Sequence, residues 1–154
     1  MDTGAPMPHI KLFESRELLC GYMVSEPTIS SDDEEEFAVV AFHRVSQFTF
    51  GYPNDEALGA HPLDDHGIAF YAFNQMQESP YLKELGRRNA SVFPGSEGMW
   101  TSKQHYIVAF HDETLEVVCT GIEYLGSVCA ESASDAINII KAKQVSGGNR
   151  RQRL

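Results

Sequence analysis

The chain has 154 residues, 42% of them hydrophobic, and this length fits one domain that can bury a core of its own. The first 140 residues hold all 22 acidic residues but only 7 of the 12 basic ones, a net charge of −15, whereas the last fourteen carry +5. An acidic body repels nucleic acid and anionic membrane surfaces and attracts basic ones, so the charge argues against the first two as partners.

The first third of the chain predicts a flexible end, two strands and an acidic loop. Residues 1–9 contain proline and glycine and are expected to be flexible. Residues 17–25 are typical of a strand, and residues 37–50 of a longer one with a bend near 44–47, because its length exceeds that of a usual strand. The loop between these strands holds five adjacent carboxylates that repel one another and stay solvated: Asp32, Asp33, Glu34, Glu35 and Glu36.

The following segment is rich in residues that favour turns. Residues 51–67 contain aspartate, proline and glycine and predict a long surface loop with one helical turn, capped by Asn54 and stopped by Gly59. Residues 68–77, with the sequence IAFYAFNQMQ, predict a second clear strand because apolar and aromatic residues dominate them.

A short helix is expected next. Ser79 is suited to the N-cap and Pro80 to the first helical position, and Asn89 is the expected end. Residues 90–103 are predicted to be irregular, and they contain the single tryptophan of the chain, Trp100. A rigid aromatic side chain in such a loop is a candidate binding anchor.

Residues 105–122 predict the best hairpin of the chain. A turn at residues 111–114 pairs Phe110 with Leu115, Val108 with Val117 and Tyr106 with Cys119, and it makes one face apolar apart from the tyrosine hydroxyl. The opposite face carries the polar side chains His105, His111 and Glu116.

The last predicted element is a helix over residues 132–144. Ser132 and Asp135 resemble a capping box at its start. Glycines and an asparagine within residues 146–149 are expected to end it, which leaves residues 146–154 as a flexible basic tail. Residues 10–145 then form a single domain.

These elements predict an α+β fold. Its strands outnumber its helices and do not alternate with them, which argues against a doubly wound parallel sheet. We expect a mainly antiparallel sheet of about four to six strands, covered on one face by the two helices.

A loop cluster is the candidate metal site. Loops concentrate functional residues, and two imidazoles with two carboxylates are suitable ligands for a divalent cation. Their spacing matches no zinc or calcium pattern, so a metal-assisted hydrolase is the alternative and not the main hypothesis. Its residues would be His61, Asp64, Asp65 and His66, completed by His111.

The hairpin histidines form a second cluster. His105 and His111 share a face, but six residues of strand separate their Cα atoms by roughly 20 Å, too far to share one ion. We expect His111 to meet Glu116 diagonally across the hairpin, where the carboxylate would stabilise an imidazolium.

The composition favours a binding function over catalysis. No G-x-S-x-G motif or glycine-rich phosphate loop is present, so no catalytic residue is assigned and no cofactor is expected. We predict a module, immunity-like or regulatory by analogy of charge and size alone, that recognises a basic surface of another protein. A structural subunit of a homo-oligomer is a third alternative. The predicted contact residues are Asp32, Asp33, Glu34, Glu35, Glu36, Asp112, Glu113 and Trp100.

The expected location is the cytoplasm. The N-terminus lacks the basic and apolar regions of a signal peptide, and the longest apolar run is far shorter than a membrane span. Three cysteines without C-x-x-C spacing are typical of reduced thiols rather than of a disulfide framework.

Overall fold

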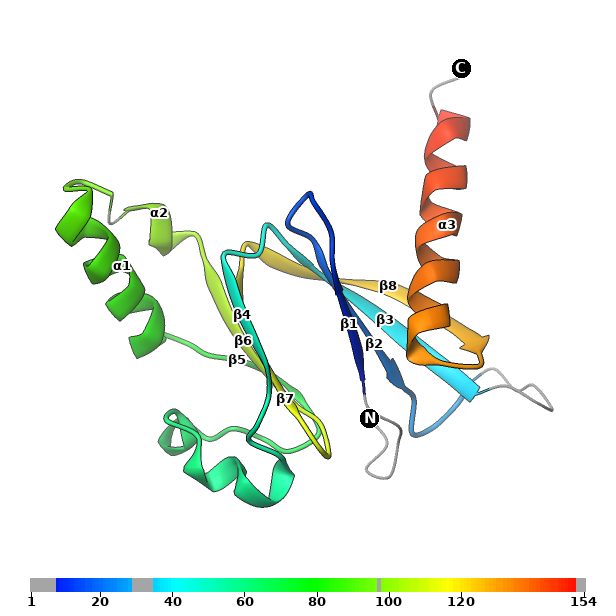
Figure 1. The fold of residues 1–154 in the computed structure, drawn as a ribbon, viewed down its shortest axis with the longest axis horizontal. Helices are drawn as coiled ribbons and strands as arrows, with labels where there is room; N and C mark the ends of the chain where they lie inside the picture. Colours follow the sequence, from blue (N-terminus) through cyan, green and yellow to red (C-terminus); the bar gives the residue numbers. More distant parts are fainter. Residues whose placement is uncertain (1–7, 29–34, 97, 152–154) are drawn as a thin grey trace. The chain divides into compact units, whose positions relative to one another are not determined.

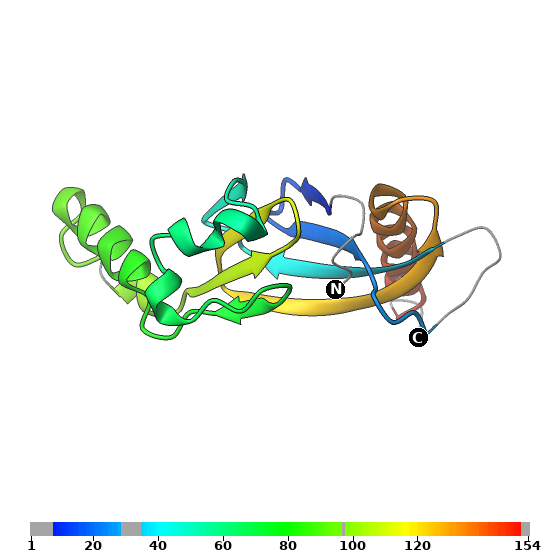
Figure 2. The same ribbon diagram turned by 90° about the horizontal axis from the view of Figure 1, so that it is seen from below.

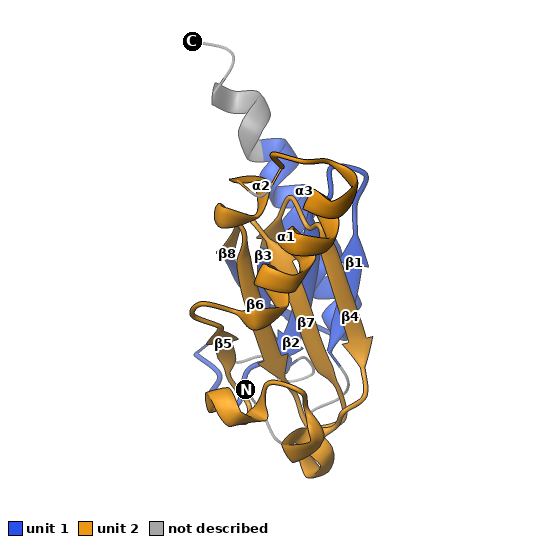
Figure 3. Cartoon of the chain, turned by 90° about the vertical axis from the view of Figure 1, so that its left-hand side faces the viewer, with its two compact units in different colours: residues 1–41, 123–154 blue, residues 42–122 orange. Residues whose placement is uncertain are grey.

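A computed structural model describes residues 8–28, 35–96 and 98–151 of the chain, drawn in two views in Figures 1 and 2. Within these residues it confirms the α+β class, with two antiparallel sheets of four strands each and three α-helices. The contacts divide the domain into two compact units, coloured in Figure 3: unit 1 comprises residues 1–41 and 123–154, and unit 2 comprises residues 42–122.

Unit 1 contains most of the first sheet, in which the strand order is β1-β2-β3-β8. Strand β2 confirms the predicted strand over residues 17–25. Strand β1 pairs with β2, with His9 opposite Gly21, so His9 belongs to a strand and not to a flexible end. The strands are β1 (His9–Leu12), β2 (Leu18–Met23), β3 (Glu35–His43) and β8 (Gly121–Ala130).

Helix α3 (Ala133–Arg151) packs on this sheet. The Ser132 hydroxyl oxygen accepts the amide of Asp135 at 3.2 Å, which confirms the predicted cap. The predicted end at 146–149 is wrong, because glycine weakens a helix interior by only about 1 kcal/mol and does not break it. Residues 146–151 are therefore helical. Among the described residues, no helix has the length and apolar character that a membrane crossing requires.

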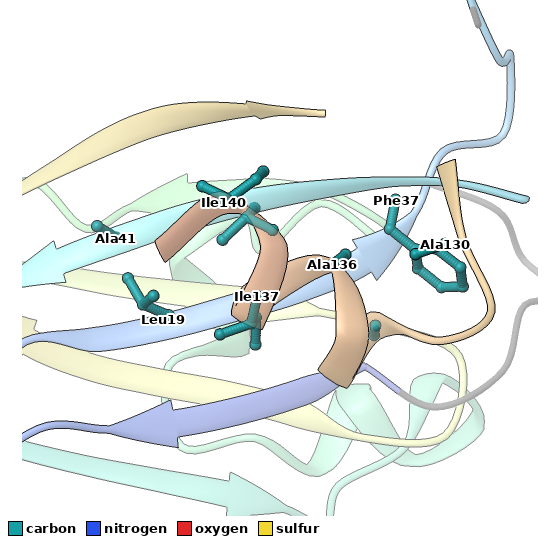
Figure 4. Packing of buried hydrophobic residues seen from close by; sticks show 9 residues of the cluster. Leu19, Phe37, Ala41, Ala130, Ala136, Ile137 and Ile140 are labelled. Carbon is teal, nitrogen blue, oxygen red and sulfur yellow. The ribbon is translucent and has the colours of Figure 1, made fainter. Parts of the chain in front are cut away.

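The core of unit 1 lies between α3 and the strands, as Figure 4 shows. Ile137 and Ile140 of α3 point towards Leu19 of β2 and Ala41 of β3. Gly21 allows α3 to approach β2 closely, because a Cβ on Gly21 would lie 2.7 Å from the Ala133 carbonyl oxygen. The absence of a side chain at Gly21 therefore allows the first residues of α3 to lie against β2.

Replacing Gly21 by alanine should lower the free energy of unfolding by about 1–3 kcal/mol, the usual cost of overpacking. The added methyl group would meet backbone at 2.7 Å and the Cγ1 atom of Ile137 at 3.2 Å. Urea unfolding measures the loss. Gly121→Ala is the matched control, since a Cβ there has no described atom within 4 Å. Equal stabilities of the two variants would contradict the close approach of α3.

Unit 2 contains the second sheet, in which the strand order is β4-β7-β6-β5. The predicted bend is confirmed: β3 ends at His43, Arg44 has a left-handed φ of 48°, and the next strand begins in the other sheet. The bend therefore transfers the chain from one sheet to the other. The strands are β4 (Gln47–Gly51), β5 (Phe73–Gln75), β6 (Gln104–Ala109) and β7 (Thr114–Cys119).

The predicted strand over residues 68–77 is wrong in extent. Only Phe73–Gln75 pair, as β5 with β6. Tyr71 has a φ of 53°, which interrupts an extended chain. The Asn74 side chain also bonds the Ala69 amide at 2.8 Å and its carbonyl at 2.9 Å, so it closes the preceding residues into a loop.

The β6–β7 hairpin keeps its predicted faces but shifts its register by two residues. It pairs Val108 with Leu115 instead of Val117. The Phe110 amide donates to the Glu113 carbonyl at 2.9 Å, which leaves a two-residue turn. Because side chains alternate with a period of two, a shift of two leaves each of them on its predicted face. The predicted apolar face is buried.

The segment over residues 51–67 lies at the surface, as predicted, but it also buries two leucines. It forms two 3₁₀ helices, η1 (Asp55–Ala60) and η2 (Asp64–His66), and the Asn54 side chain caps η1 as predicted. Leu58 and Leu63 are buried in a cluster with Ile68 and with Ile107 and Ala109 of β6. This segment therefore covers the second face of the hairpin, which a local pattern did not indicate.

Helix α1 (Pro80–Val92) starts as predicted, with the Ser79 hydroxyl oxygen accepting the Leu82 amide at 3.1 Å. It passes the expected end at Asn89 by one turn. Within the region predicted to be irregular, the short helix α2 (Gly98–Thr101) contains Trp100. Tyr81 places the start of α1 beside the hairpin, with its ring centroid 5.4 Å from that of His105.

Candidate functional site

The second face of the hairpin carries one buried and one partly buried ionisable residue. His105 has no exposed surface, and the Glu116 side chain is 21% exposed. The register places His105 opposite Val118 and Ile107 opposite Glu116, so His105 and Glu116 are diagonal neighbours. Burying such groups is costly unless they find partners, and the surrounding side chains supply them.

His105 is the centre of a hydrogen-bonded network. Its Nε2 atom lies 2.8 Å from Oε1 of Glu116, and its Nδ1 atom lies 2.8 Å from Oγ of Ser79. In the neutral ring, Nε2–H donates to the carboxylate and Nδ1 accepts the serine hydroxyl proton. The same serine oxygen caps α1, so the network joins the start of that helix to strands β6 and β7.

The network contains the residue types of a nucleophilic triad, but its geometry does not fit one. Ser79 is only 2% exposed, and its oxygen already accepts the Leu82 amide. In a serine protease triad the histidine faces the serine with Nε2 and the acid with Nδ1, whereas here Nε2 faces the acid. The network therefore orients Glu116 and does not activate Ser79.

Glu116 is held in its charged form. Burial alone would raise the pKa of this carboxyl, but the hydrogen bond from His105, the imidazoles of His105 and His61, and a hydrogen bond from Thr49 together hold the pKa below its ordinary value. The carboxylate is thus ionised at neutral pH although it is partly buried. Such a group is typical of a ligand site as well as of a structural pair.

His61 approaches the same carboxylate from the segment between η1 and η2. Its Nδ1 atom accepts the Leu63 amide at 3.1 Å, and its Nε2 atom lies 4.0 Å from Oε2 of Glu116. Burial lowers the pKa of His61, and His105 adds to this effect against the attraction of Glu116 and Asp64. His61 is therefore neutral at neutral pH.

The structure does not assemble the predicted metal cluster. His61 turns inward, whereas the other three members of its loop, Asp64, Asp65 and His66, are exposed. Over residues 8–28, 35–96 and 98–151, no group of three or more histidine, cysteine, aspartate or glutamate side chains is placed to hold a metal ion.

The predicted contact between His111 and Glu116 is wrong. His111 bonds Asp112 at 2.9 Å and lies 4.0 Å from Asp55, at the exposed end of the hairpin. In the shifted register, the diagonal neighbour of Glu116 is His105 instead. The sequence indicated which polar residues share the face, but not which pair of them meets.

The predicted contact residues differ in their exposure to solvent. Of the acidic loop, Asp32, Asp33 and Glu34 lie outside the described residues, and Glu35 is exposed. Glu36 was expected to be solvated, but it is 3% exposed and its carboxylate accepts the Thr28 amide. In the hairpin turn, Asp112 is exposed as expected, whereas Glu113 is buried, with its Oε2 atom unpaired among the described atoms.

Trp100 lies in an apolar groove between α1 and α2, hereafter the α1–α2 groove, with a volume of about 450 Å³. Residues at intervals of four on α1 form one side, and the small side chains among them leave the space open. A Cβ on Gly86 would lie 3.5 Å from Cβ of Trp100, so even an alanine at this position would be in van der Waals contact with the tryptophan. The lining residues are Leu82, Lys83, Gly86, Arg87, Ala90, Trp100 and Thr101.

Comparison of the chain with protein-family models, with curated proteins and with solved structures found no match. Two features of unit 2 are therefore argued from their own geometry: the α1–α2 groove around Trp100, and the buried network around Glu116. Sequence reasoning singled out Trp100 and the hairpin histidines. It missed Ser79 as a partner of His105, although the serine was identified as the helix cap.

Proposed function

We propose that this chain is a protein-binding module whose α1–α2 groove receives an apolar segment of its partner. The observation that carries the proposal is the groove itself, together with three large apolar side chains that are exposed in the same stretch of chain. Val92, Phe93 and Met99 are each more than 60% exposed. Exposed apolar side chains are typical of binding surfaces, in which a few aromatic anchors dominate the affinity.

Charge at the groove suggests what flanks the inserted segment. Lys83 and Arg87 line the groove, with side chains 67% and 72% exposed. Helix α1 carries three basic residues against one acidic residue, Glu84, which is shared by Arg87 and Arg88. An acidic residue beside the apolar anchor of the partner would complement this edge.

The net charge of −10 continues to favour a basic partner surface at longer range, where the exposed Glu35 and Asp112 contribute. The net charge would affect how fast the partner associates, whereas the α1–α2 groove would hold a segment of the partner once it is bound. The two expectations make different predictions about the sequence of a bound peptide.

Selection of a random linear peptide library on the purified chain tests the proposal. Enriched peptides should contain a large apolar residue next to aspartate or glutamate. Trp100→Ala should weaken their binding at least tenfold, as for an anchor worth more than about 1.4 kcal/mol. Gly86→Leu should weaken it similarly, because its side chain would occupy the groove.

Tyr52→Ala is the matched control, since Tyr52 is an aromatic residue of unit 2 that is 81% exposed and does not line the α1–α2 groove. Its peptide affinity should equal that of the unmodified chain. Peptides rich in lysine or arginine would overturn the acidic flank and favour the basic partner. Peptides that bind the Trp100→Ala chain equally well, or no enrichment, would overturn the groove as the binding site.

A further inference from the structure

A second cavity in unit 2 is independent of the α1–α2 groove. It has a volume of about 380 Å³ and lies beside the partly buried carboxylate of Glu116, and this size is within the range of small-molecule sites. We call it the polar cavity. Its lining residues are His61, Pro62, Leu63, Pro80, Tyr81 and Glu116.

The polar cavity presents one fixed donor. The Leu63 amide donates to Nδ1 of His61, so in the neutral ring the proton must be on Nε2. The side chain of His61 is only 5% exposed, and its nearest carboxylate oxygen, Oε2 of Glu116, is 4.0 Å away. That separation is too long for a hydrogen bond.

The polar cavity also presents one fixed acceptor. The hydrogen bond from His105 at 2.8 Å fixes the Glu116 carboxylate through Oε1, and Thr49 also hydrogen-bonds this side chain. The network behind it, which includes Ser79, is buried and cannot readily reorganise. Donor and acceptor therefore keep their separation without contacting each other.

One oxygen atom fits between them. An atom about 2.8 Å from both Nε2 of His61 and Oε2 of Glu116 would see them at an angle of about 90°, close to the geometry of a hydroxyl oxygen. A hydroxyl group can accept from the imidazole and donate to the carboxylate at once. A ketone can only accept, a protonated amine can only donate, and a carboxylate would be repelled by Glu116.

We propose that the polar cavity binds a small apolar alcohol or phenol, whose hydroxyl group bridges His61 and Glu116. The ring of the ligand would contact Pro62, Pro80 and Tyr81, which supply an apolar wall. The buried His105 and Ser79 are positioning residues that hold the carboxylate in place.

Matched six-membered rings test the proposal: cyclohexanol, cyclohexanone and cyclohexylamine, each titrated into the full chain at neutral pH. The NMR shift of the Leu63 amide reports binding, because that amide donates to His61. Cyclohexanol should bind in the millimolar range, as expected for so small a ligand, and at least tenfold more tightly than the ketone or the amine.

Two variants separate the two hydrogen bonds. Glu116→Gln, which can still accept from His105, should weaken cyclohexanol binding about tenfold. His61→Phe should remove the preference for the alcohol over the amine, because only the bond to Glu116 remains. His66→Phe, an exposed histidine in the same segment, is the control and should leave the affinity unchanged. Unfolding curves check that each variant is folded.

Each other outcome overturns the proposal. Tighter binding of cyclohexylamine would make the polar cavity a cation site governed by Glu116 alone. Equal binding of cyclohexanone would show that the carboxylate does not contribute. No binding of any of the three rings would show that the cavity holds water only.

Discussion

Truncating Phe110 to alanine should lower the free energy of unfolding by about 3–5 kcal/mol, which is the usual cost of removing a buried aromatic side chain. Phe110 is 3% exposed and follows β6 at the turn of the hairpin, on the same face as Val108 and Leu115. The loss combines the transfer free energy of the ring atoms that are removed with the cost of the cavity that they leave. Urea unfolding followed by circular dichroism measures it.

Phe70→Ala is the matched control, because Phe70 is an exposed phenylalanine of the same unit. It should change the stability by less than about 1 kcal/mol, as surface substitutions usually do. A loss below about 1 kcal/mol for Phe110→Ala would show that the apolar face of the hairpin is not packed as described.

The hairpin shows what a sequence pattern can determine. Alternation of apolar and polar residues assigned Tyr106, Val108 and Phe110 to one face correctly, although the predicted register was displaced by two residues. An even displacement preserves every face, so the face is determined by the pattern, whereas the pairing is determined by the turn. The sequence was compatible with a longer turn than the one that forms.

The hairpin face that carries His105 is covered by a segment whose burial no local sequence pattern indicates. Leu58 and Leu63 lie among aspartate, glycine and proline residues, so they have neither helical nor strand periodicity. They nevertheless pack with Ile107 and Ala109, on the hairpin face that also carries His105. Strand β2, the helix caps and the bend were therefore predictable, but β1, the extent of β5 and the burial of the polar residues were not.

The acidic loop shows a second unpredicted burial. Adjacent carboxylates were expected to be solvated together, yet Glu36 lies in a strand that is buried on both faces, where Thr28 and Ser127 hydrogen-bond it. Its neighbour Glu35 is exposed. A carboxylate of a charge run can thus be buried where neighbouring segments supply hydrogen-bond donors, and a buried carboxylate cannot contact a partner.

Replacing His105 by leucine should destabilise the chain by about 3 kcal/mol at neutral pH, because it leaves the Glu116 carboxylate without its principal partner. The lost interaction is a hydrogen bond to a charged, partly buried acceptor, and Ser79 also loses its contact with the imidazole. Equilibrium unfolding in urea measures this loss, and the exposed His66→Leu is the control that should leave the stability unchanged.

The pH dependence should distinguish this cause from a simple packing defect. In the unmodified chain the pKa of Glu116 is lowered, so its stabilising effect is present above the ordinary carboxyl pKa and is lost as pH falls through the folded value. Without His105, burial dominates and should raise this pKa above its ordinary value. The His105→Leu chain should then regain part of its stability as pH falls through the raised value.

The double variant His105→Leu/Glu116→Gln completes the test. With the charge removed, the loss caused by His105→Leu should shrink to about 1 kcal/mol, measured against Glu116→Gln alone. A pair that interacts through charge must show this coupling, whereas a histidine that only fills space would cost the same in both backgrounds. Additive losses, with no regained stability at low pH, would show that His105 acts by packing and that Glu116 is positioned by other groups.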